Sequence, residues 1–362
     1  MKKQILIRTV IYMALMVVLS SFTGCDVKLP VPSFGNDDNS YISQGMAEIE
    51  RGDFDSAMTL FDSALNEGED ARAALRGKGM AALALGNYDA AQSHLRSALS
   101  ESNGIIKDID IDIAYYLAVA EYRSGDPDGA IKTYDAILEI RPEEDNAYYM
   151  RGKAYLMQGD KSKALSDYEM AVSLAPQDYD HYLRICEDLR EAGYESEGDE
   201  YLRRVMDSGS KLSDYQLGVF NYYLGNYTEA RNYLENARGG KKTDENLILY
   251  LGRTYEELGD MNYAISLYDG YIAEGGEESA GAYVRLGLAK MQLGDYQGAL
   301  DAFESGINMG GGSYMQSLLY NKIVAYEYMR DFATAKKLIA EYVEKYPGDE
   351  KAARENIFLS TR

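Results

Sequence analysis

Apolar residues recur along this chain at the three- and four-residue spacing of amphipathic α-helices, and the helical segments come in pairs. The clearest pair occupies Asn146–Pro176, where two amphipathic segments meet at Gly159 and Asp160. Pro176 closes the pair, because proline cannot continue a helix. The same layout recurs before and after this stretch, which predicts an all-α protein built from helix–turn–helix units.

The turn between the two helices of each pair carries a glycine that returns at intervals of about 34 residues. The turn glycines are Gly52, Gly86, Gly125, Gly159, Gly193, Gly225, Gly259 and Gly294. A small residue follows five positions after the turn and a large apolar or aromatic one nine positions after it, as Ala164 and Tyr168 follow Gly159. Another small residue usually stands seven positions before the turn, as Gly152 does.

Each recurring position has an expected mechanical role. The turn glycine ends the first helix in the left-handed conformation. The small residues let two helix backbones approach closely, and the large residue fills the space beside them, since protein interiors are close-packed. Pro142, Pro176 and Pro347 are expected to end second helices. Ser213 and Gln216 are expected to form a capping box at the start of a first helix.

Nine such units begin near residues 38, 72, 111, 145, 179, 211, 245, 280 and 316. Two of them depart from the pattern. In the fifth unit, Cys186 and Gly198 hold the small positions and the aromatic residue is shifted to Tyr194. In the ninth unit, Arg330 replaces the turn glycine. A length of 362 residues alone would suggest two or three domains, but so many units in phase predict one elongated solenoid.

The repeat resembles that of the tetratricopeptide repeat family, most closely in Tyr148–Pro176 and Ala282–Gly306. The resemblance implies a right-handed superhelical solenoid of about nine helix–turn–helix repeats over residues 38–349, with residues 350–362 as a C-terminal capping helix. In that family the first helices line a concave groove that holds a peptide or protein partner. The resemblance implies no cofactor, no metal and no catalytic residue.

The family's inward positions, carried onto this chain, give a groove lined by tyrosine with scattered basic residues and methionine. Tyrosine and arginine suit a partner-binding surface, because they bury large areas and still offer directed polar groups. The expected groove residues are Arg76, Met80, Tyr115, Tyr122, Tyr149, Lys153, Arg190, Tyr215, Tyr222, Arg253, Met291 and Tyr320. Because the chain has 33 tyrosines, a purely structural role for some of them stays open.

The chain is strongly acidic, with 59 acidic and 37 basic residues and a formal net charge of −22. Such a surface repels phosphate backbones, so we expect no nucleic-acid partner. The acidic residues either keep a long exposed solenoid soluble or attract a basic partner, and both interpretations stay open. A monomer is favoured, and no motif identifies the protein or peptide partner.

The first 24 residues have the pattern of a signal peptide and not of the repeats. Basic residues precede an apolar run, Val10–Leu19, which is shorter than the about 20 residues of a membrane span. The segment ends at Gly24 and Cys25 and resembles the lipobox of bacterial lipoproteins, with Phe22 where leucine is usual.

The lipobox resemblance implies a signal peptide over residues 1–24, a lipidated Cys25, and a linker over residues 25–37. The chain would then be extracytoplasmic and attached to the bacterial cell membrane by its N-terminal lipid. The alternative is an uncleaved signal anchor. Both interpretations place the repeats outside the cytoplasm.

The repeats carry no enzyme signature. The two histidines, His94 and His181, lie in helices of different repeats, and we expect no cysteine or acidic partner at metal-ligand spacing for either. Both are therefore expected to be surface or edge residues. Cys186 stands where other repeats have glycine or alanine, which predicts a small buried residue without redox chemistry.

These observations favour a non-enzymatic, lipid-anchored scaffold that binds proteins or peptides in the cell envelope. Two alternatives stay open. One is a glycan- or solute-binding lipoprotein, in which tyrosine rings would stack on sugars. The other is a regulatory subunit of a cell-wall or secretion machinery.

Overall fold

A computed structural model of the chain describes residues 40–102, 104–239, 244–275, 279–346 and 349–361. Within these ranges the regular structure consists of nineteen α-helices and one short 3-10 helix, with no strand. The expected all-α repeat solenoid is thus confirmed. The described residues divide after Gly198 into two compact units, which we call the N-terminal unit and the C-terminal unit.

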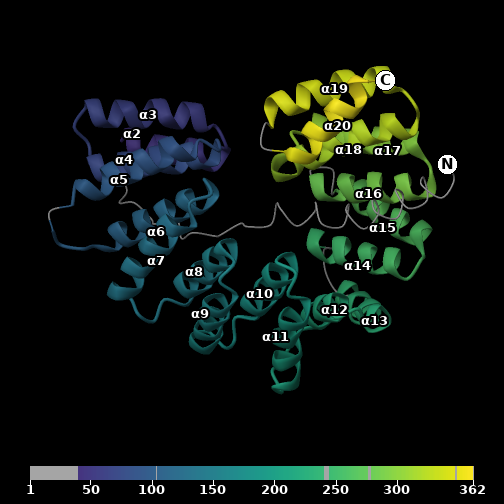
Figure 1. Ribbon diagram of the computed structural model, residues 1–362, viewed down its shortest axis with the longest axis horizontal. Helices are drawn as coiled ribbons and strands as arrows, with labels where there is room; N and C mark the ends of the chain where they lie inside the picture. Colours follow the sequence, from purple (N-terminus) through teal and green to yellow (C-terminus); the bar gives the residue numbers. More distant parts are fainter. Residues whose placement is uncertain (1–39, 103, 240–243, 276–278, 347–348, 362) are drawn as a thin grey trace. The chain divides into compact units, whose positions relative to one another are not determined.

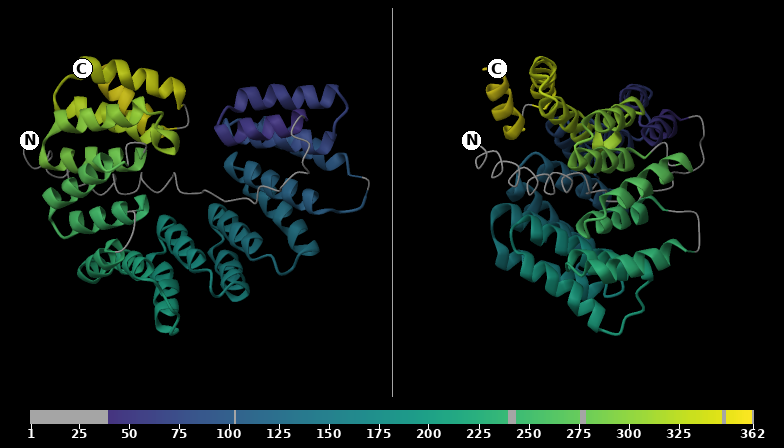
Figure 2. Two further views of the ribbon diagram at one scale, coloured as in Figure 1. Left: turned by 180° about the vertical axis from the view of Figure 1, so that it is seen from behind. Right: turned by 90° about the vertical axis from the view of Figure 1, so that its right-hand side faces the viewer.

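The N-terminal unit contains four helix pairs and the first helix of a fifth. Each pair forms a helical hairpin, and consecutive hairpins lie side by side within the unit (Figures 1 and 2). Its helices are α2 (Tyr41–Arg51), α3 (Phe54–Asn66), α4 (Ala71–Ala84), α5 (Tyr88–Ser100), α6 (Asp108–Arg123), α7 (Pro127–Ile140), α8 (Asp145–Gln158), α9 (Lys161–Leu174) and α10 (Tyr179–Glu191).

The C-terminal unit contains four further helix pairs, a short 3-10 helix and a single last helix. Its helices are α12 (Asp214–Tyr223), α13 (Tyr227–Arg238), α14 (Glu245–Glu257), α15 (Met261–Ala273), α16 (Ala280–Leu293), α17 (Tyr296–Asn308), η1 (Gly312–Tyr314), α18 (Met315–Tyr328), α19 (Phe332–Lys345) and α20 (Glu350–Ser360). The division between the units falls inside α11 (Glu195–Asp207). This helix belongs to the fifth pair, whose sequence departs from the repeat.

Helices pack mainly against their neighbours in the chain. The two helices of a pair contact each other, and the second helix contacts the first helix of the next pair, as α5 contacts α6. First helices of consecutive pairs also touch, as α4 touches α6 and α14 touches α16. The apolar cores are correspondingly local, and one of them joins Leu95, Ile113 and Leu117 of α5 and α6. Stability in such a stack is a sum of repeat and nearest-neighbour terms.

The turn between the helices of a pair combines a left-handed glycine with a helix cap that is an aspartate in most pairs. Gly159 has φ 80°, a conformation that glycine adopts without a Cβ clash. Asp160 then begins the second helix, because its carboxylate accepts the amide of Lys163 at 3.1 Å. In the ninth pair Arg330 adopts the same conformation, with φ 64°. The expected role of the turn position is therefore confirmed.

The small residues mark the closest approach of two helices, as expected. A Cβ added to Gly252 would lie 2.3 Å from Cζ of Tyr268, and one added to Gly152 would lie 2.8 Å from Cε1 of Tyr168. The same geometry joins Gly45 with Phe61, Gly79 with Leu95, Gly218 with Leu234, and Gly287 with Phe303. The large residue nine positions after each turn thus fills the space that the glycine leaves.

Two further expectations about helix ends are confirmed. Helices α7 and α9 each end two residues before a proline, Pro142 and Pro176, whereas Pro347 lies outside the described residues. Ser213 Oγ accepts the amide of Gln216 at 3.2 Å, and Gln216 Oε1 accepts the amide of Ser213 at 2.9 Å. These two bonds form the expected capping box at the start of α12.

In the described part of the chain, no helix has the length and apolar character needed to cross a membrane. The expected signal peptide, Cys25 and the linker up to residue 37 lie outside the described residues. The predictions made for them remain predictions.

Candidate functional site

The twelve residues expected to line a groove all lie on first helices, from α4 to α18, but at different depths. Seven are partly exposed: Met80, Tyr122, Lys153, Arg190, Tyr215, Arg253 and Tyr320. Five are buried: Arg76, Tyr115, Tyr149, Tyr222 and Met291. A partner could reach the buried side chains only if helices moved apart. For these five, the expectation of a groove-lining side chain is corrected to a packing role between helices.

Arg76 and Tyr115 show what the buried side chains do. The Arg76 guanidinium on α4 forms an ion pair with Asp112 of α6 and lies 5.3 Å from the ring centroid of Tyr116. Burial raises the pKa of Tyr116 to about 12. The Tyr115 ring packs edge-on against Tyr134 of α7, with 6.1 Å between the centroids. These contacts join neighbouring helices inside the N-terminal unit.

Tyr149 and Lys153 lie one turn apart on α8 and converge on Asp188 of α10. The Tyr149 hydroxyl donates a hydrogen bond of 2.8 Å to Asp188 Oδ2, and Lys153 Nζ donates one of 2.7 Å to Asp188 Oδ1. The Tyr168 hydroxyl donates to the same Oδ2 over 3.4 Å. Asp188 is buried, so the charge of Lys153 is neutralised within the N-terminal unit.

Five other expected residues are spread over separate helices. Met80 packs against the apolar cores on either side of α4, and Met291 is part of the core of α16, α17 and α18. Tyr320 packs against the cores on both sides of α18. Tyr122 and Arg190 are partly exposed in the last turns of α6 and α10.

The C-terminal unit gathers three expected residues with two that sequence reasoning missed. We call Tyr215, Tyr222, Tyr223, Tyr250 and Arg253 the Arg253 cluster. Tyr222 lies at its centre, with ring centroids 5.5 Å from Tyr223 and 5.8 Å from Tyr250. Tyr215 packs edge-on against Tyr250 at 6.4 Å. Of the two missed residues, Tyr250 carries a signal in the sequence, since it precedes Arg253 by one helical turn.

Arg253 lies against aromatic faces instead of a carboxylate. Its guanidinium carbon is 4.7 Å from the ring centroid of Tyr222 and 5.4 Å from that of Tyr250. Its Nε is buried without a hydrogen-bond partner, and among the described residues no carboxylate forms an ion pair with it. Arginine stays charged at all physiological pH values. Within the described residues, cation–π contacts with two tyrosine rings therefore hold this charged guanidinium in the C-terminal unit.

A comparison between repeats explains why Arg253 lacks an acidic partner. Arg253 and Lys153 hold the same repeat position, six residues before their turn glycines. The next repeat supplies Asp188 to Lys153, five residues before its own turn glycine. The repeat that follows Arg253 has Ala289 at that place. The fifth repeat thus supplies a counter-charge to Lys153, whereas the eighth repeat supplies none to the equivalent Arg253.

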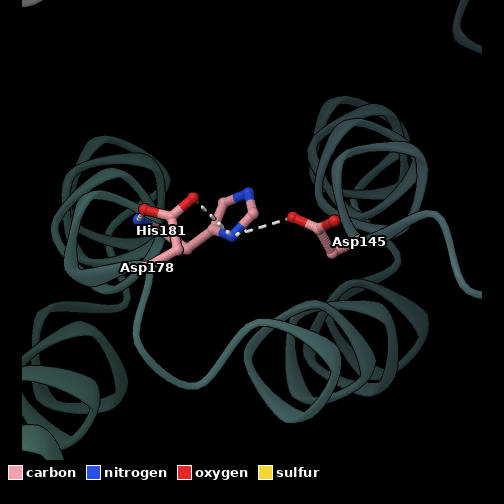
Figure 3. A group of neighbouring side chains, drawn as sticks. All are labelled: Asp145, Asp178 and His181. Carbon is pink, nitrogen blue, oxygen red and sulfur yellow. Dashed lines mark hydrogen bonds and ion pairs between the residues drawn. The ribbon is translucent and has the colours of Figure 1, made fainter.

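His181 does not lie at a surface or edge, and this expectation was wrong. The side chain is fully buried, and its Nδ1 lies 3.4 Å from Asp178 Oδ2 and 3.5 Å from Asp145 Oδ2 (Figure 3). Burial lowers the pKa of His181. The expectation that no acidic partner lies at metal-ligand spacing is also corrected, because the donor atoms of all three residues lie within 4.8 Å of one another.

The remaining candidates behave as small or ordinary helix residues. Cys186 is buried, and a Cβ added to Gly198 would lie 2.8 Å from the Cys186 carbonyl oxygen, so the expected small buried residue is confirmed. His94 is half-buried on α5, where burial lowers its pKa. Cys25, the expected lipidation site, lies outside the described residues.

Comparison with protein families identifies the repeat. A family model described as tetratricopeptide repeat matches residues 42–104, 113–179 and 249–312, which together make up more than half of the chain. A second tetratricopeptide repeat model matches residues 317–349.

Individual proteins resemble parts or most of the chain. BBSome complex member BBS4 of Bos taurus is 26% identical over 47% of this chain and 34% of its own length. Serine/threonine-protein phosphatase T of Trypanosoma brucei brucei is 33% identical over 27% of this chain and 22% of its own length. The chain therefore spans about a third or less of these relatives. A tetratricopeptide repeat protein from Parabacteroides merdae, known from a crystal structure, is 19% identical with a TM-score of 0.46, over 82% of this chain and 98% of its own.

Proposed function

Because the chain belongs to the tetratricopeptide repeat family, we propose that it is a non-enzymatic scaffold that binds a protein or peptide at the Arg253 cluster. The observation that carries this proposal is the guanidinium of Arg253, which has aromatic neighbours and no carboxylate partner among the described residues. The partner's segment would place an acidic side chain on Arg253 and apolar side chains on the partly exposed rings of Tyr215, Tyr223 and Tyr250.

Tyrosine and arginine supply most of the affinity in many protein interfaces, because they combine a large contact area with directed hydrogen bonds. The rings of Tyr222 and Tyr250 already hold the guanidinium in place, so little side-chain entropy would be lost on binding. A hydrogen bond between charged groups contributes about 1.5–3 kcal/mol. One such contact would fix the register of the partner, and the apolar contacts around it would supply the remaining affinity.

The net charge of −22 opposes the approach of an acidic segment at long range. That repulsion is screened beyond about 8 Å at physiological ionic strength. At contact distance the nearest charge is Arg253, and the surrounding rings exclude water and strengthen its interaction. The scaffold would therefore select a short acidic segment within a largely neutral or basic partner.

A random peptide library displayed against the purified full chain tests this proposal. We expect the enriched peptides to share an acidic residue flanked by apolar residues. Arg253→Gln should weaken their binding at least about tenfold, since a charge-assisted hydrogen bond is lost. Arg330→Gln, which removes an exposed arginine between α18 and α19, is the matched control and should bind normally. Equal binding by both variants would move the docking site away from Arg253.

We further propose that the scaffold is attached to the outside of a bacterial cell membrane by a lipid on Cys25. The support is the sequence alone: a basic start, an apolar run and the Gly24–Cys25 ending of the first segment. Cells fed an alkyne-labelled fatty acid should label the wild type and not Cys25→Ser. The Cys25→Ser variant should also leave the membrane fraction. A labelled Cys25→Ser protein would contradict the lipid anchor without affecting the docking proposal.

One relative is consistent with a scaffold role, since its name describes it as a member of a complex. In the envelope, photo-crosslinking from position 215 would identify what lies against the Arg253 cluster. The scaffold proposal requires a protein that is lost in Arg253→Gln and retained in Arg330→Gln. Capture of wall polysaccharide instead would favour a glycan-binding lipoprotein.

A further inference from the structure

Three side chains from two neighbouring repeats converge in the N-terminal unit at a place that the docking proposal does not use. Asp145 is the first residue of α8, and Asp178 and His181 lie at the start of α10. We propose that Asp145 Oδ2, Asp178 Oδ2 and His181 Nδ1 form a binding site for a zinc-like divalent metal ion. Figure 3 shows both carboxylates pointing toward the same ring nitrogen.

The hydrogen-bond partner of Nε2 determines which ring nitrogen of His181 carries the proton. Its Nε2 lies 3.3 Å from Asn146 Oδ1, a carbonyl oxygen that can only accept a hydrogen bond. The proton of a neutral imidazole therefore lies on Nε2, and Nδ1 presents a lone pair. That lone pair faces two carboxylate oxygens and has no hydrogen-bond partner. Three electron-rich atoms face one another, and a cation between them removes the repulsion.

The alternative to a metal ion between these three atoms is a proton on Nδ1. It would place a charged imidazolium in a fully buried position, where the lost hydration costs free energy. A metal ion instead binds the neutral imidazole, which is the form that burial favours. The charged groups nearest the ring are Asp145, Asp178, Asp180 and Arg184, and together they carry two negative charges. A divalent cation neutralises them.

The two nitrogen–oxygen separations fit a tetrahedral ion, and all three donor atoms lie within 4.8 Å of one another. Zinc binds carboxylate oxygen and imidazole nitrogen at about 2.0–2.2 Å, which places tetrahedral ligands about 3.4 Å apart. His181 Nδ1 lies 3.4 Å from Asp178 Oδ2 and 3.5 Å from Asp145 Oδ2. The imidazole ligand also favours zinc and similar ions over magnesium and calcium.

The surroundings hold the donors in place. Asp178 Oδ1 accepts the backbone amides of Asp180 at 3.1 Å and His181 at 3.3 Å. Asp178 Oδ2 lies 4.0 Å from Arg184 Nη2, beyond hydrogen-bond distance, and faces His181. The His181 ring packs against Tyr149, with 5.4 Å between the centroids. Such outer contacts fix ligand orientation in metal sites. Both carboxylates are partly exposed, so the ion has an entry path and water can occupy a fourth position.

Cobalt(II) titration of the purified full chain in excess magnesium tests the site, because the magnesium saturates non-specific acidic surface. We expect one cobalt ion per chain with the intense visible absorption of a tetrahedral complex, and displacement of that cobalt by zinc. Asp178→Asn and His181→Gln should each weaken cobalt binding about 100-fold or more, since loss of an outer contact alone costs 10–100-fold. Asn remains a good helix cap, so Asp178→Asn should preserve α10.

Asp180→Asn and His94→Gln are the matched controls, because they remove an adjacent carboxylate and the other histidine without touching the three donors. Both should retain the cobalt spectrum. An absent or weak six-coordinate spectrum would overturn the proposal, and so would a tetrahedral spectrum that survives in Asp178→Asn and His181→Gln. None of these outcomes depends on Arg253, so the metal site and the docking surface are tested separately.

Discussion

The Tyr149 hydroxyl donates a 2.8 Å hydrogen bond to Asp188 across the interface between α8 and α10. Lys153 donates to the other oxygen of the same carboxylate, and all three groups are largely removed from water. An aspartate of one repeat therefore neutralises a lysine and satisfies a tyrosine of the preceding repeat. This contact couples the fourth and fifth repeats.

Replacing Asp188 should loosen that coupling. Asp188→Ala removes the buried carboxylate that pairs with Lys153 and accepts from Tyr149, and we expect a loss of about 3 kcal/mol of stability. Hydrogen exchange should accelerate in α8 and α10 but not in α16, because contacts in a repeat stack are local. Asp188→Asn is the control, since it keeps an acceptor for Tyr149 and should lose less. Uniform acceleration over the whole chain would contradict the local coupling.

The close approach of helices at Gly252 gives a second prediction. A Cβ at this position would lie 2.3 Å from Tyr268 Cζ, so Gly252→Ala should lower the free energy of unfolding by about 1–3 kcal/mol. Gly270 is the matched control within α15, because a Cβ there meets no atom within 4 Å. Gly270→Ala should therefore stabilise the protein by about 0.5–1 kcal/mol. Denaturant unfolding of both variants measures the difference.

Part of this structure could be predicted from sequence because it repeats locally. The turn glycine and the small and large residues around it recur in phase, so each copy confirms the interpretation of the others. Gly252 and Tyr268, for example, are sixteen residues apart and belong to one hairpin. Sequence periodicity reports such contacts directly.

The contacts of the expected site residues with other repeats could not be predicted in the same way. Lys153 and Arg253 occupy one repeat position, and only the residue supplied by the next repeat decides which of them is neutralised. Asp188 and Ala289 differ there without disturbing the helical pattern. Asp145 likewise reaches His181 over 36 residues, a separation at which neither helical period nor motif spacing indicates contact.

The ninth turn offers a stabilising substitution. Arg330 holds a left-handed conformation, with φ 64°, at the position where the other turns have glycine. A residue with a Cβ is disfavoured there by about 1–2 kcal/mol. Arg330→Gly should therefore raise stability by about 1 kcal/mol, seen as a higher midpoint of thermal unfolding. The reverse change at an ordinary turn, Gly294→Arg, should lower the midpoint, and a shift of the same sign in both variants would contradict the argument.

A glutamate on α18, close to a second glutamate on α20, should make stability dependent on pH. Burial, together with the charge of Glu355 and a hydrogen bond to it, raises the pKa of Glu327 on α18 to about 8. An unfolded glutamate titrates near pH 4.3. Between about pH 4.3 and 8 the folded chain therefore binds more protons than the unfolded chain, and stability falls as the pH rises through this window.

Glu327→Gln removes this titration and keeps the size and polarity of the side chain. The variant should melt close to the wild type at pH 4.5 and about 3 °C above it at pH 9, because only the wild type then carries a buried charge. Glu344→Gln changes an exposed glutamate of α19 and serves as the control. It should shift the melting temperature little at either pH. A constant difference between Glu327→Gln and the wild type across the range would show that Glu327 does not hold its proton in the folded chain.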